Sequence, residues 1–209
     1  MNKDYYDSMK KIFFIITAIV LSLTITNSAL AKEKVLENFI KNTINNQISQ
    51  LAQEPIIVNA VTEANIKADK SLAEIMQLDQ KWRNADETDK WVSSFLDNRC
   101  ANFLKNVQYD SAKGAKGIYA EIFLMDKQGN IVAESNMTSD YWQGDEDKFI
   151  KAFNEEKGAF FIDSPAFDES TEKYLIHFSV PVLDQKTKKA IGVITIGIDI
   201  DAFAARYIY

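Results

Sequence analysis

The ten residues from Asp140 to Phe149, DYWQGDEDKF, combine aromatic rings and carboxylates in a way that could bind a small molecule. Tyr141 and Trp142 are adjacent in a polar stretch, so neither fits the three- or four-residue spacing of a helix core. A tyrosine and a tryptophan beside carboxylates form a good receptor for an ammonium group, through cation–π contacts and charge pairing. The alternative is that one ring packs against the fold while the acids face water. For Tyr141 and Trp142 both interpretations stay open.

The acids at Asp145, Glu146 and Asp147 have a simpler interpretation. Negative charges in the first turn of a helix are stabilised by the helix dipole. We therefore predict that these acids begin a helix and do not contact a ligand.

Few other residues could carry out catalysis. His177, the only histidine, is predicted to lie within a strand, and the sequence names no nucleophile or acid partner for it. We interpret it as a strand histidine with a satisfied hydrogen bond. Cys100, the only cysteine, is interpreted as a half-buried small residue. Zinc, phosphate-loop and serine-hydrolase motifs are missing from the sequence, and the many carboxylates show neither a glycosidase spacing nor an EF-hand spacing. We predict a protein that is not an enzyme, with no catalytic residues, no metal site and no cofactor.

The composition narrows the class of protein further. A formal net charge of −6 at pH 7 makes the chain a poor candidate for binding nucleic acid or anionic membrane surfaces. A single cysteine allows no intramolecular disulfide, so the fold must be held together by packing.

The N-terminus has the pattern of a secretory signal peptide. Two lysines precede an apolar run, IFFIITAIVLSLTIT, and an A-x-A pattern ends at Ala31. We predict cleavage after Ala31, which removes residues 1–31 and delivers the protein to the periplasm or the medium without a stable membrane anchor. Met1 and Met9 both stay open as the true start.

The sequence from residue 32 to residue 108 is predicted to be helical. Apolar residues at i, i+4 spacing predict a long helix from Lys32 to Ala52, and Pro55 interrupts it. Ser71 and Glu74 in SLAE form a possible capping box. The three helices expected after Pro55 cover about 57–64, 71–82 and 88–104.

The sequence from residue 117 to residue 200 is predicted to form five strands with mostly short connections, which favours an antiparallel sheet. In the first strand the residues alternate between the two faces of the sheet. We expect the helices to cover the face of Ile118, Ala120, Ile122 and Leu124, and the segment 136–158 to close the face of Tyr119 and Glu121. A sheet face closed by such a lid is a natural place for a small-molecule pocket. The predicted fold class is α+β.

The order of these segments resembles the Cache domain, the PAS-like extracytoplasmic sensor module of bacterial chemoreceptors and sensor kinases. The resemblance is to the stand-alone, single-Cache form and covers residues 32–209 as one domain. It implies a long N-terminal helix packed on a five-stranded antiparallel PAS-like sheet, with a small ligand held under a helical lid. The segments that carry it are LAQEPIIVNAV, IFLMDKQGNIVAES, TSDYWQGDEDKF, FDESTEKYLIHFSVPV and AIGVITIGIDI.

The resemblance also implies a ligand site. Cache ligands include amino acids, amines and small carboxylates, and the family's lid aromatics match Tyr141 and Trp142. Its carboxylates that hold a ligand amine match Asp168 and Asp199. The arginine that grips a ligand carboxylate in amino-acid-binding members has no counterpart near Tyr141 in the sequence, so we expect an amine-bearing or neutral ligand. The predicted ligand-binding residues are Tyr119, Glu121, Tyr141, Trp142, Asp168 and Asp199.

We therefore predict a periplasmic sensor protein that binds a small molecule and presents it to a membrane sensor kinase or chemoreceptor. The alternative is a ligand-free interaction or scaffold protein that regulates a membrane partner. Both a monomer and a homodimer stay open.

Overall fold

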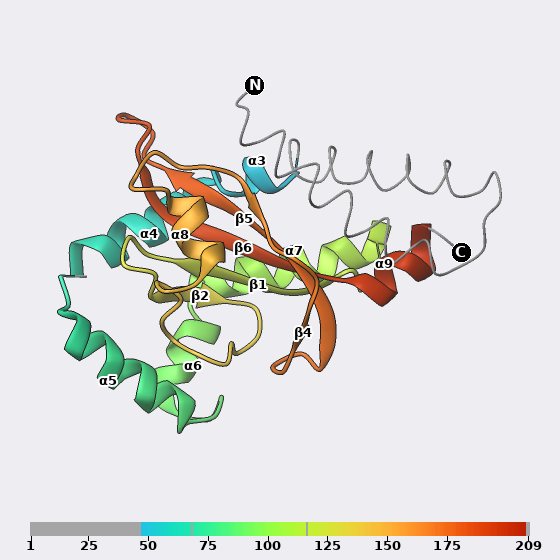
Figure 1. Cartoon of the computed structure of the whole chain (residues 1–209), viewed down its shortest axis with the longest axis horizontal. Coiled ribbons are helices and arrows are strands. Elements are labelled where there is room, and N and C mark those ends of the chain that lie inside the picture. The colour runs from blue at the N-terminus through green and yellow to red at the C-terminus, as the bar shows by residue number, and fades with distance from the viewer. Residues whose placement is uncertain (1–46, 68, 116, 208–209) are drawn as a thin grey trace.

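The computed structural model describes residues 47–67, 69–115 and 117–207 (Figure 1). The predicted signal peptide and its cleavage site lie outside these residues. So does most of the long helix predicted to end at Ala52, of which the last turn, α3 (Ser49–Leu51), is described. In the part of the chain that the structure describes, none of the helices combines the length and the apolar character needed to cross a membrane.

A six-stranded antiparallel sheet forms the centre of the fold, with strand order β2-β1-β6-β5-β3 and with β4 also paired to β5. The strands are β1 (Tyr119–Met125), β2 (Ile131–Glu134), β3 (Phe161–Ile162), β4 (Ala166–Asp168), β5 (Lys173–Leu183) and β6 (Ala190–Asp199). The predicted α+β class with an antiparallel sheet is confirmed.

The sheet contains one strand more than the sequence predicted. β3 and β4 both pair with β5, through different parts of that long strand. Pro165 lies between them, and because proline has no N–H to donate it interrupts the ladder there. β4 is only three residues long, which is too short for a period of two to be recognised.

Helices precede the strands along the chain, follow them, and in one case lie between β2 and β3. They are α4 (Pro55–Lys67), α5 (Leu72–Arg83), α6 (Lys90–Leu96), α7 (Arg99–Ala115), α8 (Asp147–Phe153) and α9 (Ile200–Tyr207). The capping box of α5 is confirmed, because the Ser71 hydroxyl accepts the N–H of Glu74 while the Glu74 carboxylate accepts the N–H of Ser71. Pro55 begins α4, at the helix position where a missing N–H costs nothing.

The single helix predicted over 88–104 is in fact two helices, α6 and α7. The break falls at Asp97 and Asn98, residue types that favour helix ends over helix interiors. The Asn98 side chain accepts the N–H of Ala101 at the start of α7 and donates to the carbonyl of Val132 on β2. The break therefore anchors α7 to the edge of the sheet.

The two faces of the sheet are covered by different elements, with α7 behind the sheet and α8 in front of it (Figure 1). Ile122 and Leu124 of β1 share one buried cluster with Ile57 and Val61 of α4 and Leu104 of α7. The opposite face packs against α8 and aromatic residues of α5 and α6, in a second cluster that includes Trp82, Phe95, Phe123, Met125 and Phe149. The predicted covering of Ile122 and Leu124 by helices is confirmed.

The prediction that Tyr119 lies on the sheet face closed by the segment 136–158 is wrong. A β-bulge lies between Tyr119 and Glu121. Tyr119 pairs with Ile198 and Glu121 pairs with Gly197, so two residues along β1 correspond to one residue along β6. The extra residue reverses the alternation of side chains. Tyr119 therefore packs in the cluster on the helix-covered face, where its hydroxyl donates to Gln47 Oε1 (3.1 Å).

The packing of α7 gives a first prediction. Leu104→Ala removes a side chain that is fully buried between α7 and the sheet, and should lower the free energy of unfolding by about 2–5 kcal/mol. The control Ile66→Ala removes a side chain of α4 that is 80% exposed and should change it by less than about 0.5 kcal/mol. Urea unfolding of both variants measures the difference. Similar losses in the two would contradict the assigned core.

Candidate functional site

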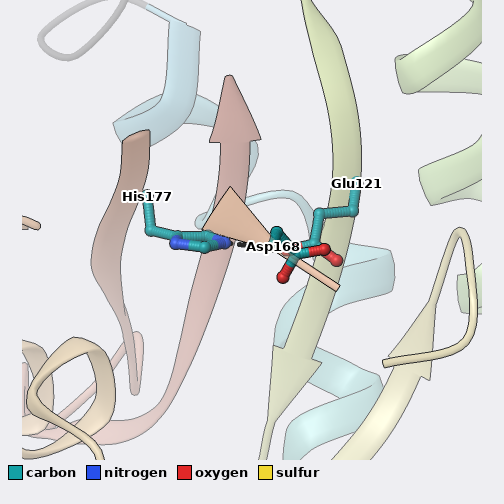
Figure 2. A group of neighbouring side chains, drawn as sticks. All are labelled: Glu121, Asp168 and His177. Atoms are coloured by element: carbon teal, nitrogen blue, oxygen red, sulfur yellow. Dashed lines mark hydrogen bonds and ion pairs between the residues drawn. The ribbon is translucent and has the colours of Figure 1, made fainter. Parts of the chain in front are cut away.

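Glu121 on β1 and His177 on β5 meet across the strand that separates them, β6 (Figure 2). In the sheet both residues pair with Gly197. His177 Nε2 and Glu121 Oε1 are 2.8 Å apart, and both residues are buried. Strands two positions apart in a sheet are separated by about 9–10 Å, so only long side chains can make this contact.

The glycine between them makes the contact possible. A Cβ at position 197 would lie 2.8 Å from Glu121 Cγ, 3.2 Å from Glu121 Oε1 and 2.9 Å from Leu175 Cδ1. A side chain on the middle strand would therefore occupy the space through which Glu121 reaches His177. The absence of a side chain at Gly197 is a requirement of this site.

Asp168 of β4 completes the group, and the three side chains point toward one another in Figure 2. One ligand atom from each of Glu121, Asp168 and His177 lies within 4.8 Å of the others. Asp168 Oδ1 accepts hydrogen bonds from Ser170 Oγ (2.7 Å), Thr171 N (2.8 Å) and Thr171 Oγ1 (2.9 Å). Burial raises the pKa of Asp168, but these hydrogen bonds and the nearby His177 outweigh it and hold the pKa below its usual value. Asp168 is thus a charged group held in place.

A further carboxyl, Glu134 of β2, lies on the same face of the sheet. Glu134 pairs with Phe123 of β1, which is two residues from Glu121 and shares its face. Burial raises the pKa of Glu134 to about 8, against hydrogen bonds from Thr138 that lower it, and the nearby Glu121 charge raises it further. Glu134 is therefore mostly protonated at neutral pH.

Trp142 fixes the lid segment to the turn that joins β1 and β2. Its indole N–H donates to the carbonyl of Gln128 (2.8 Å), and its backbone N–H donates to Asp79 Oδ1 (3.0 Å). Gly129 and Gly144 allow the two backbones to touch, since a Cβ at Gly129 would lie 2.5 Å from Gly144 Cα. The ring predicted to face a ligand therefore has a structural role, through its hydrogen bond to the turn.

Tyr141 lies in an aromatic cluster rather than beside Glu121. Its ring centroid is 5.9 Å from that of Trp82, 5.3 Å from Trp91 and 5.6 Å from Phe95. It also lines a groove of about 720 Å³ between α4, α6 and the β1–β2 turn. Burial raises the pKa of its hydroxyl, and the charge of Asp126 raises it further.

Cations lie nearer to the lid than the sequence indicated. Arg83 of α5 reaches Asp140 with Nη2 (2.8 Å) and Asp79 with Nε (2.7 Å), so it is engaged by carboxylates next to Tyr141. Lys148 of α8 lies with Nζ 5.4 Å from the centre of the Phe123 ring and 3.0 Å from Glu146 Oε2. Asp147, predicted to begin the lid helix, does so as the first residue of α8.

Asp199 lies at the end of β6 with partners of its own. Its Oδ2 is 2.9 Å from Nζ of Lys173, and its Oδ1 accepts the N–H of Ala202 in the first turn of α9. The predicted set is thus divided by the structure. Glu121 and Asp168 meet, Asp199 pairs with Lys173, and Tyr119, Tyr141 and Trp142 lie elsewhere.

His177 is the residue that sequence reasoning left out of the site. Its satisfied hydrogen bond was expected, but its partner was not. One sequence feature could have indicated this contact: Glu121 and His177 are polar residues within strands that are otherwise largely apolar. A polar side chain in a buried strand needs a partner, and the other polar strand residue is the natural choice.

This arrangement can bind a cation or a hydrogen-bond donor. Two carboxylates and one imidazole converge here, with Glu121 and His177 buried and Asp168 half-buried. Thiol chemistry is not supported elsewhere in the described fold, because burial raises the pKa of Cys100 to about 12.

The family model described as "Methyl-accepting chemotaxis protein-like, first PDC sensor domain" matches residues 89–205, which is more than half of the chain. The chain therefore belongs to this family of Cache/PDC-type sensor domains, and the resemblance seen in the sequence is confirmed. None of the curated protein sequences matches the chain significantly.

Among solved structures, the chain is similar to the following three. The sensor domain of the V. cholerae histidine kinase DctB is 14% identical, with 88% of this chain and 59% of that chain covered and a TM-score of 0.47. The sensory domain of the Campylobacter jejuni chemoreceptor Tlp3 with isoleucine bound is 16% identical, covering 87% and 67%, with a TM-score of 0.39. The ligand-binding domain of the Pseudomonas aeruginosa amino acid chemoreceptor PctC in complex with GABA is 14% identical, covering 77% and 67%, with a TM-score of 0.36. The chain thus spans about three fifths of the length of the DctB sensor domain.

The glycine on β6 gives a second prediction. Gly197→Ala should break the Glu121–His177 hydrogen bond, because the new methyl group occupies the path of the Glu121 side chain. The control is Gly192→Ala on the same strand, where a Cβ would meet the carbonyl of Met125 instead. Since the chain has one histidine, the ¹⁵N resonances of its ring report on this bond alone. They should move in folded Gly197→Ala and stay in folded Gly192→Ala, and the opposite pattern would contradict the role of Gly197.

Glu134 gives a third prediction. Its folded pKa of about 8 lies above its ordinary value of 4.5, so the folded state keeps a proton that the unfolded state has lost. This contribution to stability is present below about pH 4.5 and is lost as the pH rises toward about 8. Glu134→Gln cannot ionise and should flatten the fall in unfolding free energy between pH 5 and pH 8, measured by urea unfolding. A slope equal to that of the parent protein would show that Glu134 is ionised in the fold.

Proposed function

We propose that this sensor domain binds a small amine-bearing molecule between the sheet and the segment 136–158, with the ammonium group held by Glu121 and Asp168. The observation that carries the proposal is the meeting of two carboxylates from different strands, of which Glu121 is buried and Asp168 is half-buried. An ammonium group has three N–H donors and a positive charge, and both are complementary to a pair of carboxylates.

The hydrogen bonds of the two acids support this assignment. Glu121 uses Oε1 for His177, and Asp168 uses Oδ1 for Ser170 and Thr171. Among the residues that the structure describes, none donates a hydrogen bond to Glu121 Oε2 or Asp168 Oδ2. Burial of a carboxylate is costly unless it is paired, so a cationic ligand would stabilise the site.

The position of Lys148 supports an amino-acid-like ligand in particular. Lys148 extends from the lid helix α8 over Phe123, whose ring centroid is 6.3 Å from that of His177. A ligand with its ammonium group at Glu121 and Asp168 would place a carboxylate toward Lys148. Lys148 would then bind the ligand carboxylate, as the arginine does in amino-acid-binding Cache domains. A lysine would do so as a point charge, without the bidentate geometry of a guanidinium group.

We further propose that the protein works in the periplasm or outside the cell, after cleavage following Ala31. The ligand-bound form would act on a membrane sensor kinase or chemoreceptor. The whole of residues 32–209 would form one domain, of which the family model covers 89–205. Binding, not catalysis, is the activity that this site supports.

A thermal-shift screen of amines, amino acids and carboxylates tests the proposal. A ligand at about one hundred times its Kd adds about 2.7 kcal/mol of stability, which raises the Tm by several degrees. Amines or amino acids should give this shift, and Glu121→Gln and Asp168→Asn should each abolish it. Glu169→Gln, next to Asp168 but exposed, is the matched control and should keep it.

Two outcomes would contradict the proposal. Stabilisation by carboxylates that carry no amine would show that the assigned ligand charge is wrong. The absence of a stabilising compound in a broad set would favour the alternative function, a ligand-free scaffold that regulates a membrane partner.

A further inference from the structure

We propose that Glu121, Asp168 and His177 also form a binding site for a divalent transition-metal ion, with Zn²⁺ as the best-suited ion. The inference goes beyond the amine-binding function and shares its residues. It does not depend on that function, because metal binding is measured without an amine present. The metal and an amine would compete for the same carboxylate oxygens.

The donor atoms have the right types for such an ion. Neutral imidazole nitrogen and carboxylate oxygen are both ordinary zinc ligands, and three protein ligands with one open position are typical of zinc sites that also accept a small ligand. Two carboxylates balance the charge of a divalent ion, so the loaded site is close to neutral beside the buried Glu121 and His177. An imidazole in the set favours transition metals over Mg²⁺ and Ca²⁺, which prefer all-oxygen sites.

The distances fit a site that closes on metal binding. Zinc bonds of about 2.0–2.2 Å at tetrahedral angles place ligand atoms about 3.3 Å apart. His177 Nε2 and Glu121 Oε1 are 2.8 Å apart, since a proton lies between them, and the whole group of three ligand atoms lies within 4.8 Å. A shift on the order of 1 Å therefore brings all three atoms to bonding distance of one ion.

The surroundings hold the ligands in orientation. Ser170 and Thr171 bond to Asp168 through Oδ1, which leaves Oδ2 for an ion. Such secondary hydrogen bonds fix ligand direction in metal sites. Gly197 adds no side chain of its own to the space between Glu121 and His177, which Leu175 Cδ1 also approaches. Figure 2 shows the three side chains converging from β1, β4 and β5 on this space.

A single histidine makes the test specific. With any affinity tag removed, isothermal titration of the full-length mature protein with Zn²⁺ should show one ion per chain, and Mg²⁺ or Ca²⁺ at the same concentration should give no heat. With Cu²⁺ as a probe, electron paramagnetic resonance should show coupling to nitrogen of one imidazole, which can only be His177 because the chain has no other histidine.

Substitutions then separate this site from adventitious surface binding. His177→Gln and Asp168→Asn should each weaken Zn²⁺ binding by more than about 100-fold, while the exposed control Glu169→Gln keeps the affinity of the parent. Unfolding curves without metal establish that each variant is folded. Asp168 lies at a half-buried position of a short strand, so Asp168→Asn provides the test if His177→Gln does not fold. Failure of the parent protein to bind one Zn²⁺, or full affinity in folded Asp168→Asn, would overturn the metal site. Either result would leave the amine screen unaffected.

Discussion

The hydrogen bond between Glu121 and His177 is the interaction on which the proposed site depends. It joins side chains from β1 and β5 across the backbone of β6, and it exists because Gly197 offers no side chain in between. The bond pairs Oε1 of a buried carboxylate, and among the described residues none donates a hydrogen bond to Oε2. The missing Cβ at Gly197 thus lets two polar side chains meet on this face of the sheet.

The rest of the fold divides between supporting this face and closing it. On the far side of the sheet, α4 and α7 bury the apolar residues of β1 and keep the strand in place. On the near side, Trp142 fastens the lid segment to the β1–β2 turn, and Tyr141 joins the aromatic cluster of α5 and α6. The aromatic residues therefore position the lid, while the carboxylates of Glu121 and Asp168 are the groups proposed to contact a ligand. This separation favours a cationic occupant, whether an ammonium group or a divalent ion.

Local sequence patterns predicted three features: short connections gave the antiparallel sheet, the SLAE motif gave the α5 capping box, and alternation gave the helix-covered face of Ile122. They failed where one residue changes the pattern, as at the bulge that reverses Tyr119 and at Asn98, which divides a predicted helix. Of the predicted site residues, Glu121 and Asp168 lie together, while Tyr141 and Trp142 have partners within the fold. His177 was not included, because a contact across three strands depends on register, and register depends on tertiary pairing that spacing along the chain does not encode.

A ligand bound to this protein should lie on the sheet face of Glu121 and Asp168. A crystal structure of the protein purified natively, without refolding, would show whether it does. Density for a bound cation or small molecule is expected within hydrogen-bonding or coordination distance of both carboxylates. Density for a ligand in the groove lined by Trp91 and Tyr141, with Glu121 and Asp168 contacting only protein and water, would contradict this expectation.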